Sequence, residues 1–216
     1  MKSKHFTLHD EKYFQGYQVY TDRGPLVTQY LERAFDTVHR ALQCHSRTLA
    51  IRVDLHLPDT VQQYDTAVIH RFFKSLKEQI KHNRNQALKR NPHAHQTDVR
   101  YVWCKEQGVN NKPHYHVLLL LNAYAFNSLG DSSSVEGNNM ATRIKKAWLS
   151  ALGYHSEEDR RQKGTLVHFC EDGVYRINAH HDDGTLAKVL YRLSYLCKAD
   201  SKNFAHHQHQ FGRSNR

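Results

Sequence analysis

The sequence predicts an α+β fold, in which a central antiparallel β-sheet is flanked by helices that cover one of its faces. Two observations support this prediction. The expected elements follow one another as helix, strand, helix, strand, strand, helix, strand, strand and helix. Two pairs of strands are each joined by a short segment of turn-forming residues, which is typical of β-hairpins and therefore of antiparallel pairing.

Four segments have apolar residues every three to four positions, as amphipathic helices do. The first begins at Pro25, because helices favour proline in their first turn, and continues to Leu42. The second and third cover residues 65–90 and 140–152. The fourth continues to about residue 199, and Asp183 or Thr185 can cap its start.

Five segments are expected to form strands. Residues 47–57 alternate between apolar and polar, which predicts a strand with one buried face. Residues 98–106 and 114–122 form one expected hairpin, and residues 165–170 and 174–178 form another around Asp172-Gly173. Residues 1–24 have no clear period and predict an irregular lead-in, and the polar residues 201–216 predict a flexible tail. One domain over residues 25–200 remains.

The charge of the chain indicates a polyanionic partner. The 216 residues carry a formal net charge of +10 before any of the 18 histidines is protonated, which favours nucleic acid over an anionic membrane. The longest apolar run, residues 117–121, is too short for a membrane span, and no signal-peptide core follows the start. Four scattered cysteines form neither a zinc motif nor a disulfide framework. We therefore expect a cytoplasmic protein with no membrane partner.

A divalent metal site is predicted at the first hairpin. His114 and His116 project from the same face of a strand, and Glu106 ends the partner strand eight positions before His114. Two imidazoles and a carboxylate leave coordination positions open for water or a phosphate oxygen, as catalytic sites do. The alternative is a pair of solvent-facing histidines, since His93-Ala94-His95 has the same spacing in a loop.

The last helix has a polar face opposite its apolar one. Tyr191, Tyr195, Lys198 and Lys202 recur on that face at helical spacing. Such a face can present hydroxyl nucleophiles to a phosphate, with cations beside them to offset the charge. A phenol with a pKa of about 10 needs activation by a metal or by nearby cations. Alternatively, the tyrosines rim the core or stack on bases.

Further basic residues are candidates for DNA phosphate contacts. They lie on the second helix and in the tail, and they are Arg71, Lys74, Lys77, Lys81 and Lys202. The alternative for the helix is a solvated charged face without a partner.

The two motifs together resemble the HUH endonuclease superfamily. His114-Tyr115-His116 on a strand precedes Tyr195-Leu196-Cys197-Lys198 on a helix, in the order of that superfamily. Residues 47–57 stand at the place of its first motif. The sequence around residues 103–122 and 193–200 is similar to replication proteins of filamentous phages (inoviruses) and their prophage relatives. The resemblance covers roughly residues 47–202.

This resemblance implies an HUH/RRM-like palm as the fold and an HUH endonuclease domain over residues 25–200. It further implies rolling-circle replication of a phage or prophage, in which a tyrosine nicks single-stranded origin DNA and keeps a covalent 5′-phosphotyrosine. By position, Tyr195 is the first-choice nucleophile, Lys198 positions the phosphate, and Tyr191 matches a second tyrosine. Ser194 stands where a second motif lysine would fall. The resemblance makes His114, His116 and Glu106 the ligands of Mg²⁺ or Mn²⁺.

A host polymerase would extend the free 3′-OH, and a host helicase would unwind the duplex because the chain has no phosphate-binding loop motif. Three alternatives compete with this hypothesis. A non-catalytic nucleic-acid-binding regulator on the same fold would be insensitive to metal and to Tyr195→Phe. A transposase or relaxase of the same superfamily would share the chemistry and differ in its substrate. An H-x-H-x-H phosphoesterase is disfavoured, because Leu118 occupies the third position.

Overall fold

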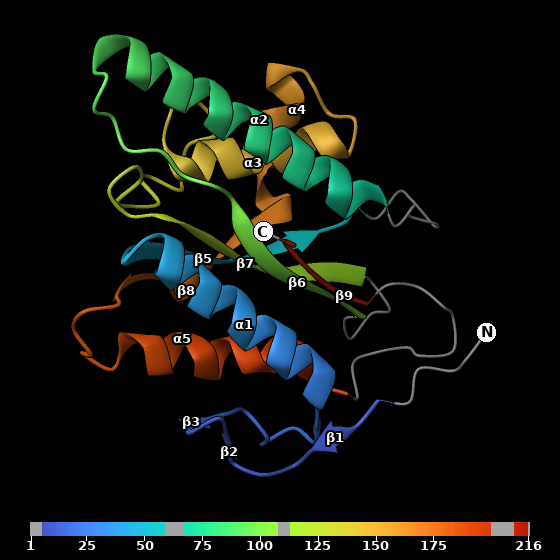
Figure 1. Cartoon of the computed structure of the whole chain (residues 1–216). Coiled ribbons are helices and arrows are strands. Elements are labelled where there is room, and N and C mark those ends of the chain that lie inside the picture. The colour runs from blue at the N-terminus through green and yellow to red at the C-terminus, as the bar shows by residue number, and fades with distance from the viewer. Residues whose placement is uncertain (1–5, 59–66, 108–112, 200–209, 216) are drawn as a thin grey trace.

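A five-stranded antiparallel sheet lies at the centre of the protein, in the strand order β8-β5-β7-β6-β9 (Figure 1). The computed structural model describes residues 6–58, 67–107, 113–199 and 210–215. In this part of the chain the predicted α+β class is confirmed. The strands of the sheet are β5 (Arg47–His56), β6 (Arg100–Gln107), β7 (Pro113–Asn122), β8 (Val167–Asn178) and β9 (Phe211–Arg213).

Helices cover both faces of this sheet, so the expectation of a single covered face is wrong (Figure 1). One face packs against α1 (Thr28–Cys44) and α5 (Thr185–Ser194), and the other packs against α2 (Ala67–Arg90) and α3 (Met140–Ala151). The reason is that the central strands β5 and β7 carry apolar side chains on both faces, and each apolar face needs cover.

The face under α1 and α5 changes from apolar to polar along its length. Leu118 and Leu120 of β7 lie in the core, whereas His116 and His114 follow at the next alternate positions. On β5, Asp54 pairs with His116. This register gathers polar groups at one end of an otherwise apolar face, and that end holds the candidate site.

The chain before the first helix is more regular than expected. Two small antiparallel sheets pair β1 with β4 and β2 with β3. The helix begins at Thr28 instead of Pro25, because Leu26 pairs with His9 and also bridges to Lys198 near the end of the domain. Long-range pairing therefore outweighs the local preference of proline for a helix start. The four strands are β1 (Leu8–His9), β2 (Tyr13–Phe14), β3 (Tyr17–Gln18) and β4 (Leu26–Val27).

The second expected hairpin is instead one strand with a bulge. Both halves of β8 pair with β5, and the register jumps between Ile51 and Val53. Asp172 lies at the bulge with a φ of 49°. A Cβ on Gly173 would lie 2.7 Å from a backbone oxygen, so this close approach requires glycine. The Asp-Gly pair thus forms a bulge beside Arg52, where a two-residue turn was expected.

The last helix is shorter than expected, and the structure contains one further helix that the sequence did not predict. Residues 195–197 continue α5 as the 3₁₀ turn η2 (Tyr195–Cys197). The residue before α5 is Gly184 with a φ of 77°, and the Asp183 side chain accepts a hydrogen bond from Thr185 N. Helix α4 (Glu157–Lys163) packs beside α3 and is followed by η1 (Gly164–Leu166). No apolar period marks α4, since all seven of its residues are polar.

Part of the expected flexible tail is an edge strand. Residues 211–213 form β9 on β6, and Lys202 lies outside the described residues. Within the described ranges, no helix combines the length and the apolarity that crossing a bilayer requires.

Truncation of Phe211 tests the contribution of β9 to stability. Its ring is 8% exposed and stacks on Tyr30 with 4.4 Å between ring centroids. We expect Phe211→Ala to lower the free energy of unfolding by about 3 kcal/mol, because the truncation leaves a cavity in the core. Urea unfolding followed by circular dichroism measures this change. Leu8→Ala is the control, since Leu8 is 56% exposed; equal unfolding midpoints for the two variants would contradict a packed β9.

Candidate active site

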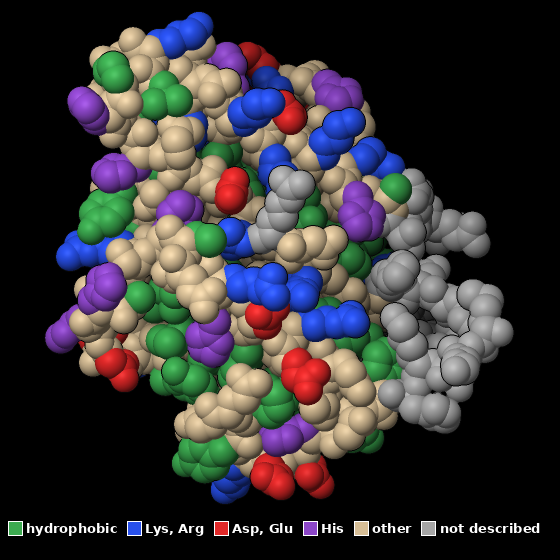
Figure 2. Space-filling model, in the orientation of Figure 1, with side chains coloured by type: hydrophobic (Ala, Val, Ile, Leu, Met, Phe, Trp, Pro, Cys, Tyr) green, Lys and Arg blue, Asp and Glu red, His purple; other side chains and the backbone are tan. Residues whose placement is uncertain are grey.

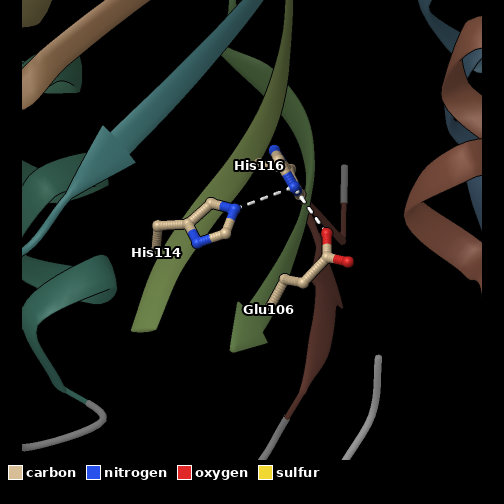
Figure 3. Close-up of side chains that lie close together, drawn as sticks. All are labelled: Glu106, His114 and His116. Atoms are coloured by element: carbon tan, nitrogen blue, oxygen red, sulfur yellow. Dashed lines mark hydrogen bonds and ion pairs between the residues drawn. The ribbon is translucent and has the colours of Figure 1, made fainter. Parts of the chain in front are cut away.

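The three predicted metal ligands lie together at the polar end of the sheet (Figure 3). Glu106 comes from β6, and His114 and His116 come from β7. The Nε2 atoms of the two histidines are 3.1 Å apart, and His116 Nε2 lies 2.6 Å from Glu106 Oε2. Strand alternation places both histidines on one face, and Glu106 is the register partner of His114.

The donor set fits a divalent cation. Ligand atoms at adjacent positions of an octahedral ion, with bonds of about 2.1 Å, are about 3 Å apart. The two separations from His116 Nε2 are close to this value, and all three ligand atoms lie within 4.8 Å of one another. His116 Nε2 can carry one proton at most, so it can donate to Glu106 or to His114 but not to both. A cation between the three atoms would satisfy all of them at once. Imidazole and carboxylate ligands suit Mn²⁺, and the carboxylate also suits Mg²⁺.

Asp54 of β5 holds the other side of the His116 ring. Its Oδ1 lies 2.6 Å from His116 Nδ1, and Arg52 Nη2 lies 2.6 Å from the same nitrogen. Arg52 also donates to Asp54 and to the backbone oxygen of Val53. When Nδ1 carries the proton and donates to Asp54, Nε2 keeps its lone pair for a metal. Carboxylate–imidazole–metal arrangements fix the tautomer and the ring in this way.

The two carboxylates of the site are held in the ionised form. Burial alone would raise the pKa of Asp54, but the hydrogen bond with His116 and the charge of Arg52 outweigh it and lower this pKa well below its usual range. Burial would likewise raise the pKa of Glu106, yet the hydrogen bonds from His116 and Lys198 lower it to about 2. Both groups are therefore available as anions at neutral pH.

We expect Asp54→Asn to weaken Mn²⁺ binding by about 10- to 100-fold, because a neutral amide oxygen is a weaker acceptor than the carboxylate for the hydrogen bond from His116 Nδ1. Isothermal titration with MnCl₂ measures the affinity. Asp36→Asn is the control, because Asp36 is ion-paired with Arg40 and Arg213 elsewhere. Equal affinities of the two variants for Mn²⁺ would show that Asp54 does not orient a ligand.

Tyr195 and Lys198 lie directly against this cluster. The rings of Tyr195 and His116 are 5.6 Å apart between centroids, in an edge-to-face arrangement. Lys198 Nζ donates to Glu106 Oε1 at 2.9 Å and lies 3.7 Å from the centroid of the Tyr195 ring. Burial would lower the pKa of Lys198, but Tyr195 and Glu106 raise it, so the side chain stays an ammonium. One buried cation therefore contacts both the Tyr195 ring and the Glu106 carboxylate.

Tyr191 lies one turn earlier than Tyr195, on α5. Tyr20, from the N-terminal segment, contacts both tyrosines, with ring centroids 5.8 Å from Tyr191 and 5.5 Å from Tyr195. Partial burial and the nearby Asp22 carboxylate raise the pKa of Tyr191, which disfavours its phenolate. Ser194 is buried, accepts from Tyr20 N and donates to the backbone oxygen of Tyr191, so it fastens the N-terminal segment to the helix.

A cleft of about 930 Å³ opens beside the tyrosines, between α5 and the bulged strand β8. Arg192 of α5 forms part of its wall and donates to the backbone oxygens of Asp172 and Glu171 and to the Tyr175 hydroxyl. These bonds fix α5, which carries Tyr191, relative to β8 of the sheet. The remaining lining is basic and aromatic at several positions, and includes Tyr20, Arg52, His116, Arg176, Lys188, Tyr191 and Tyr195.

The basic residues predicted on α2 lie on the layer opposite this cleft. Their side chains are exposed, and α2 packs on the sheet face that does not carry the cluster. Figure 2 shows Lys and Arg side chains both over the α2 layer and in a band across the middle of this view. Positive charge therefore lies both on the α2 layer and in the lining of the cleft. The residues concerned are Arg71, Lys74, Lys77 and Lys81.

Sequence reasoning missed four residues of the site: Asp54, Arg52, Tyr20 and Arg192. A signal existed for Asp54 and Arg52, since they alternate with apolar residues on a predicted strand. That signal becomes informative only when β5 is known to lie beside β7. No local pattern marks Tyr20 or Arg192, because their roles depend on contacts across 174 and about 20 residues of chain.

The fold and the site define an α+β protein with a carboxylate–imidazole cluster beside a tyrosine helix. Over residues 9–214 the chain belongs to the family described as the YagK/YfjJ C-terminal domain. It is 31% identical over 202 residues to "Uncharacterized protein YfjJ" of Escherichia coli (strain K12), covering 88% of this chain and 95% of that protein. It is 32% identical over 179 residues to "Uncharacterized protein YagK" of the same strain, covering 78% and 83%. No solved structure matches the sequence significantly.

Proposed function

We propose that this protein is a metal-dependent tyrosine endonuclease of the HUH type, which nicks single-stranded DNA and transfers the strand. One observation carries the proposal. A tyrosine, a buried lysine and a candidate metal cluster are contiguous, although they come from β6, β7 and the turn after α5. A tyrosine that only rims a core has no need of a buried ammonium shared with a metal-ligand carboxylate.

Glu106, His114 and His116 would hold Mg²⁺ or Mn²⁺. When bound, such an ion supplies electrophilic help to the phosphate and fixes its orientation. Asp54 keeps the His116 ring in place, and Arg52 donates to the Asp54 carboxylate and so holds it there. The ammonium of Lys198 stabilises negative charge that develops on the Tyr195 oxygen and on the phosphate beside it.

The proposed step is a transesterification. The Tyr195 hydroxyl oxygen forms a bond to phosphorus, and the bond between phosphorus and the 3′ oxygen of the preceding nucleotide breaks. The phenol gives up its proton and the leaving 3′ oxygen takes one up, so protons balance. The products are a 5′-phosphotyrosine and a free 3′-OH. Reversal of the step with another 3′-OH joins strands without an external energy source.

In the cell, we propose that this chemistry initiates rolling-circle replication of a phage or prophage in the bacterial cytoplasm. The net charge of +10 supports a DNA substrate. A host helicase and polymerase would unwind the origin and extend the 3′-OH. The basic and aromatic lining of the cleft supports a single-stranded substrate in the site.

A denaturing gel tests the proposal. Purified protein is incubated with Mn²⁺ or Mg²⁺ and a pool of labelled single-stranded oligonucleotides from the origin region of the source element. We expect an adduct that survives denaturation and is lost with EDTA. Binding without an adduct, from a pool shown to contain the origin, would instead support a non-catalytic nucleic-acid-binding regulator.

A further inference from the structure

We propose that a second pocket, at the far end of β8, binds a nucleobase of the single strand several nucleotides away from the nick. The pocket has a volume of about 330 Å³ and is lined by Arg47, Tyr124, Asn127, Arg176 and Asn178, among others. The choice of single-stranded DNA rests on the proposed function, whereas the pocket itself rests on the contacts described next.

The pocket is built from three segments that are distant in the sequence. Arg47 begins β5, Arg176 and Asn178 end β8, and Tyr124 and Asn127 follow β7. Arg176 donates from Nε to the backbone oxygen of Asn127 at 2.8 Å, which ties the edge of the sheet to the loop after β7. This bond joins two of the three segments of the pocket without a ligand.

The chemistry of the lining matches a nucleotide. Tyr124 is 54% exposed, and the Arg47 guanidinium lies 5.6 Å from its ring centroid. His95 stacks on Tyr124 with 4.9 Å between ring centroids. A base can continue the stack that His95 and Tyr124 form, guanidinium groups attract phosphates, and the Asn127 and Asn178 amides can donate to and accept from a base edge.

The edge strand β8 connects this pocket with the cleft of about 930 Å³ beside Tyr191 and Tyr195, here called the tyrosine cleft. Arg176 lines both cavities, and Val174, which is 41% exposed and lines the cleft, lies two residues before it on the edge strand. Four large apolar side chains are exposed in the described residues. Two of them line these cavities, Tyr124 in the pocket and Val174 in the cleft. Arg47 and Asp54 are seven positions apart on β5, a distance of about 23 Å along a strand. A single strand that leaves the nucleophile along β8 therefore reaches Tyr124 after several nucleotides.

The test measures DNA binding separately from nicking. The full-length Tyr195→Phe chain, which cannot form the adduct, is titrated against a fluorescent oligo(dT) of about 16 nucleotides, and anisotropy is recorded. Adding Tyr124→Ala is expected to weaken binding at least about 5-fold, because it removes one stacking surface. Tyr13→Ala is the matched control, since Tyr13 is 62% exposed on β2. Arg47→Gln is expected to reduce the slope of log affinity against log salt concentration by about 1, which corresponds to the loss of one phosphate contact.

The outcomes separate the pocket from the proposed function. Equal affinities of the Tyr124→Ala and Tyr13→Ala chains for the oligonucleotide would overturn the proposal that the pocket binds a base. If the wild-type chain still forms the adduct, the proposed endonuclease function stands. A loss of affinity in Tyr124→Ala but not in Tyr13→Ala supports base binding in the pocket. If the wild-type chain forms no adduct in that case, only the proposed endonuclease function is overturned. Failure of the wild-type chain to bind the oligonucleotide overturns the pocket regardless of the gel result.

Discussion

Tyr195→Phe is expected to abolish the covalent DNA adduct, with a loss of at least about 10⁴-fold in its rate of formation. The substitution removes the oxygen that would bond to phosphorus and leaves the ring in place. The ring contacts with His116, Tyr20 and Lys198 therefore persist. Binding of single-stranded DNA should be nearly unchanged, and single-turnover gels with Mn²⁺ measure the rate.

The two neighbouring tyrosines supply matched controls for this substitution. Tyr191→Phe and Tyr20→Phe make the same chemical change within the same aromatic group. Both variants should still form the adduct through Tyr195. An adduct that survives in Tyr195→Phe and disappears in Tyr191→Phe would assign the nucleophile to Tyr191, and an adduct unaffected by all three changes would refute a tyrosine nucleophile on this helix.

His116→Ala is expected to remove the metal-dependent activity by more than about 100-fold, beyond the range for residues that only orient a ligand. Both Glu106 and His114 face the Nε2 atom of this residue, so its loss leaves the other two ligands without the central member of the set. The rate of adduct formation as a function of Mn²⁺ concentration measures the effect.

His93→Ala is the control for His116→Ala, because His93 belongs to an exposed loop with the same His-x-His spacing. It should leave the metal dependence unchanged. Because His116 is buried between two carboxylates, circular dichroism and urea unfolding must show that the variant folds. A folded His116→Ala chain with an unaltered response to Mn²⁺ would exclude the cluster as the metal site.

Local patterns in the sequence predicted most elements of the fold and the grouping of Glu106, His114 and His116 at one hairpin. Alternation over residues 47–57 predicted β5, and the spacing of His114 and His116 placed both side chains on one face of β7. These predictions succeeded because strand geometry fixes the direction of alternate side chains regardless of what lies beyond the strand. They failed where partners are distant: Asp172-Gly173 is a bulge because both flanks pair with β5, and Leu26 is a strand residue because β1 and Lys198 pair with it.

By itself, the sequence determined the α+β class, the positive charge and which side chains share a face of each strand or helix. These properties depend on periods of two and of 3.6 residues, which are local. Only the tertiary structure decided that Asp54 supports His116, that Lys198 joins Tyr195 to Glu106, and that the basic face of α2 lies on the opposite layer. The physical reason is that strand order and helix placement follow from burying apolar faces throughout the chain, and polar neighbours meet wherever that packing brings them.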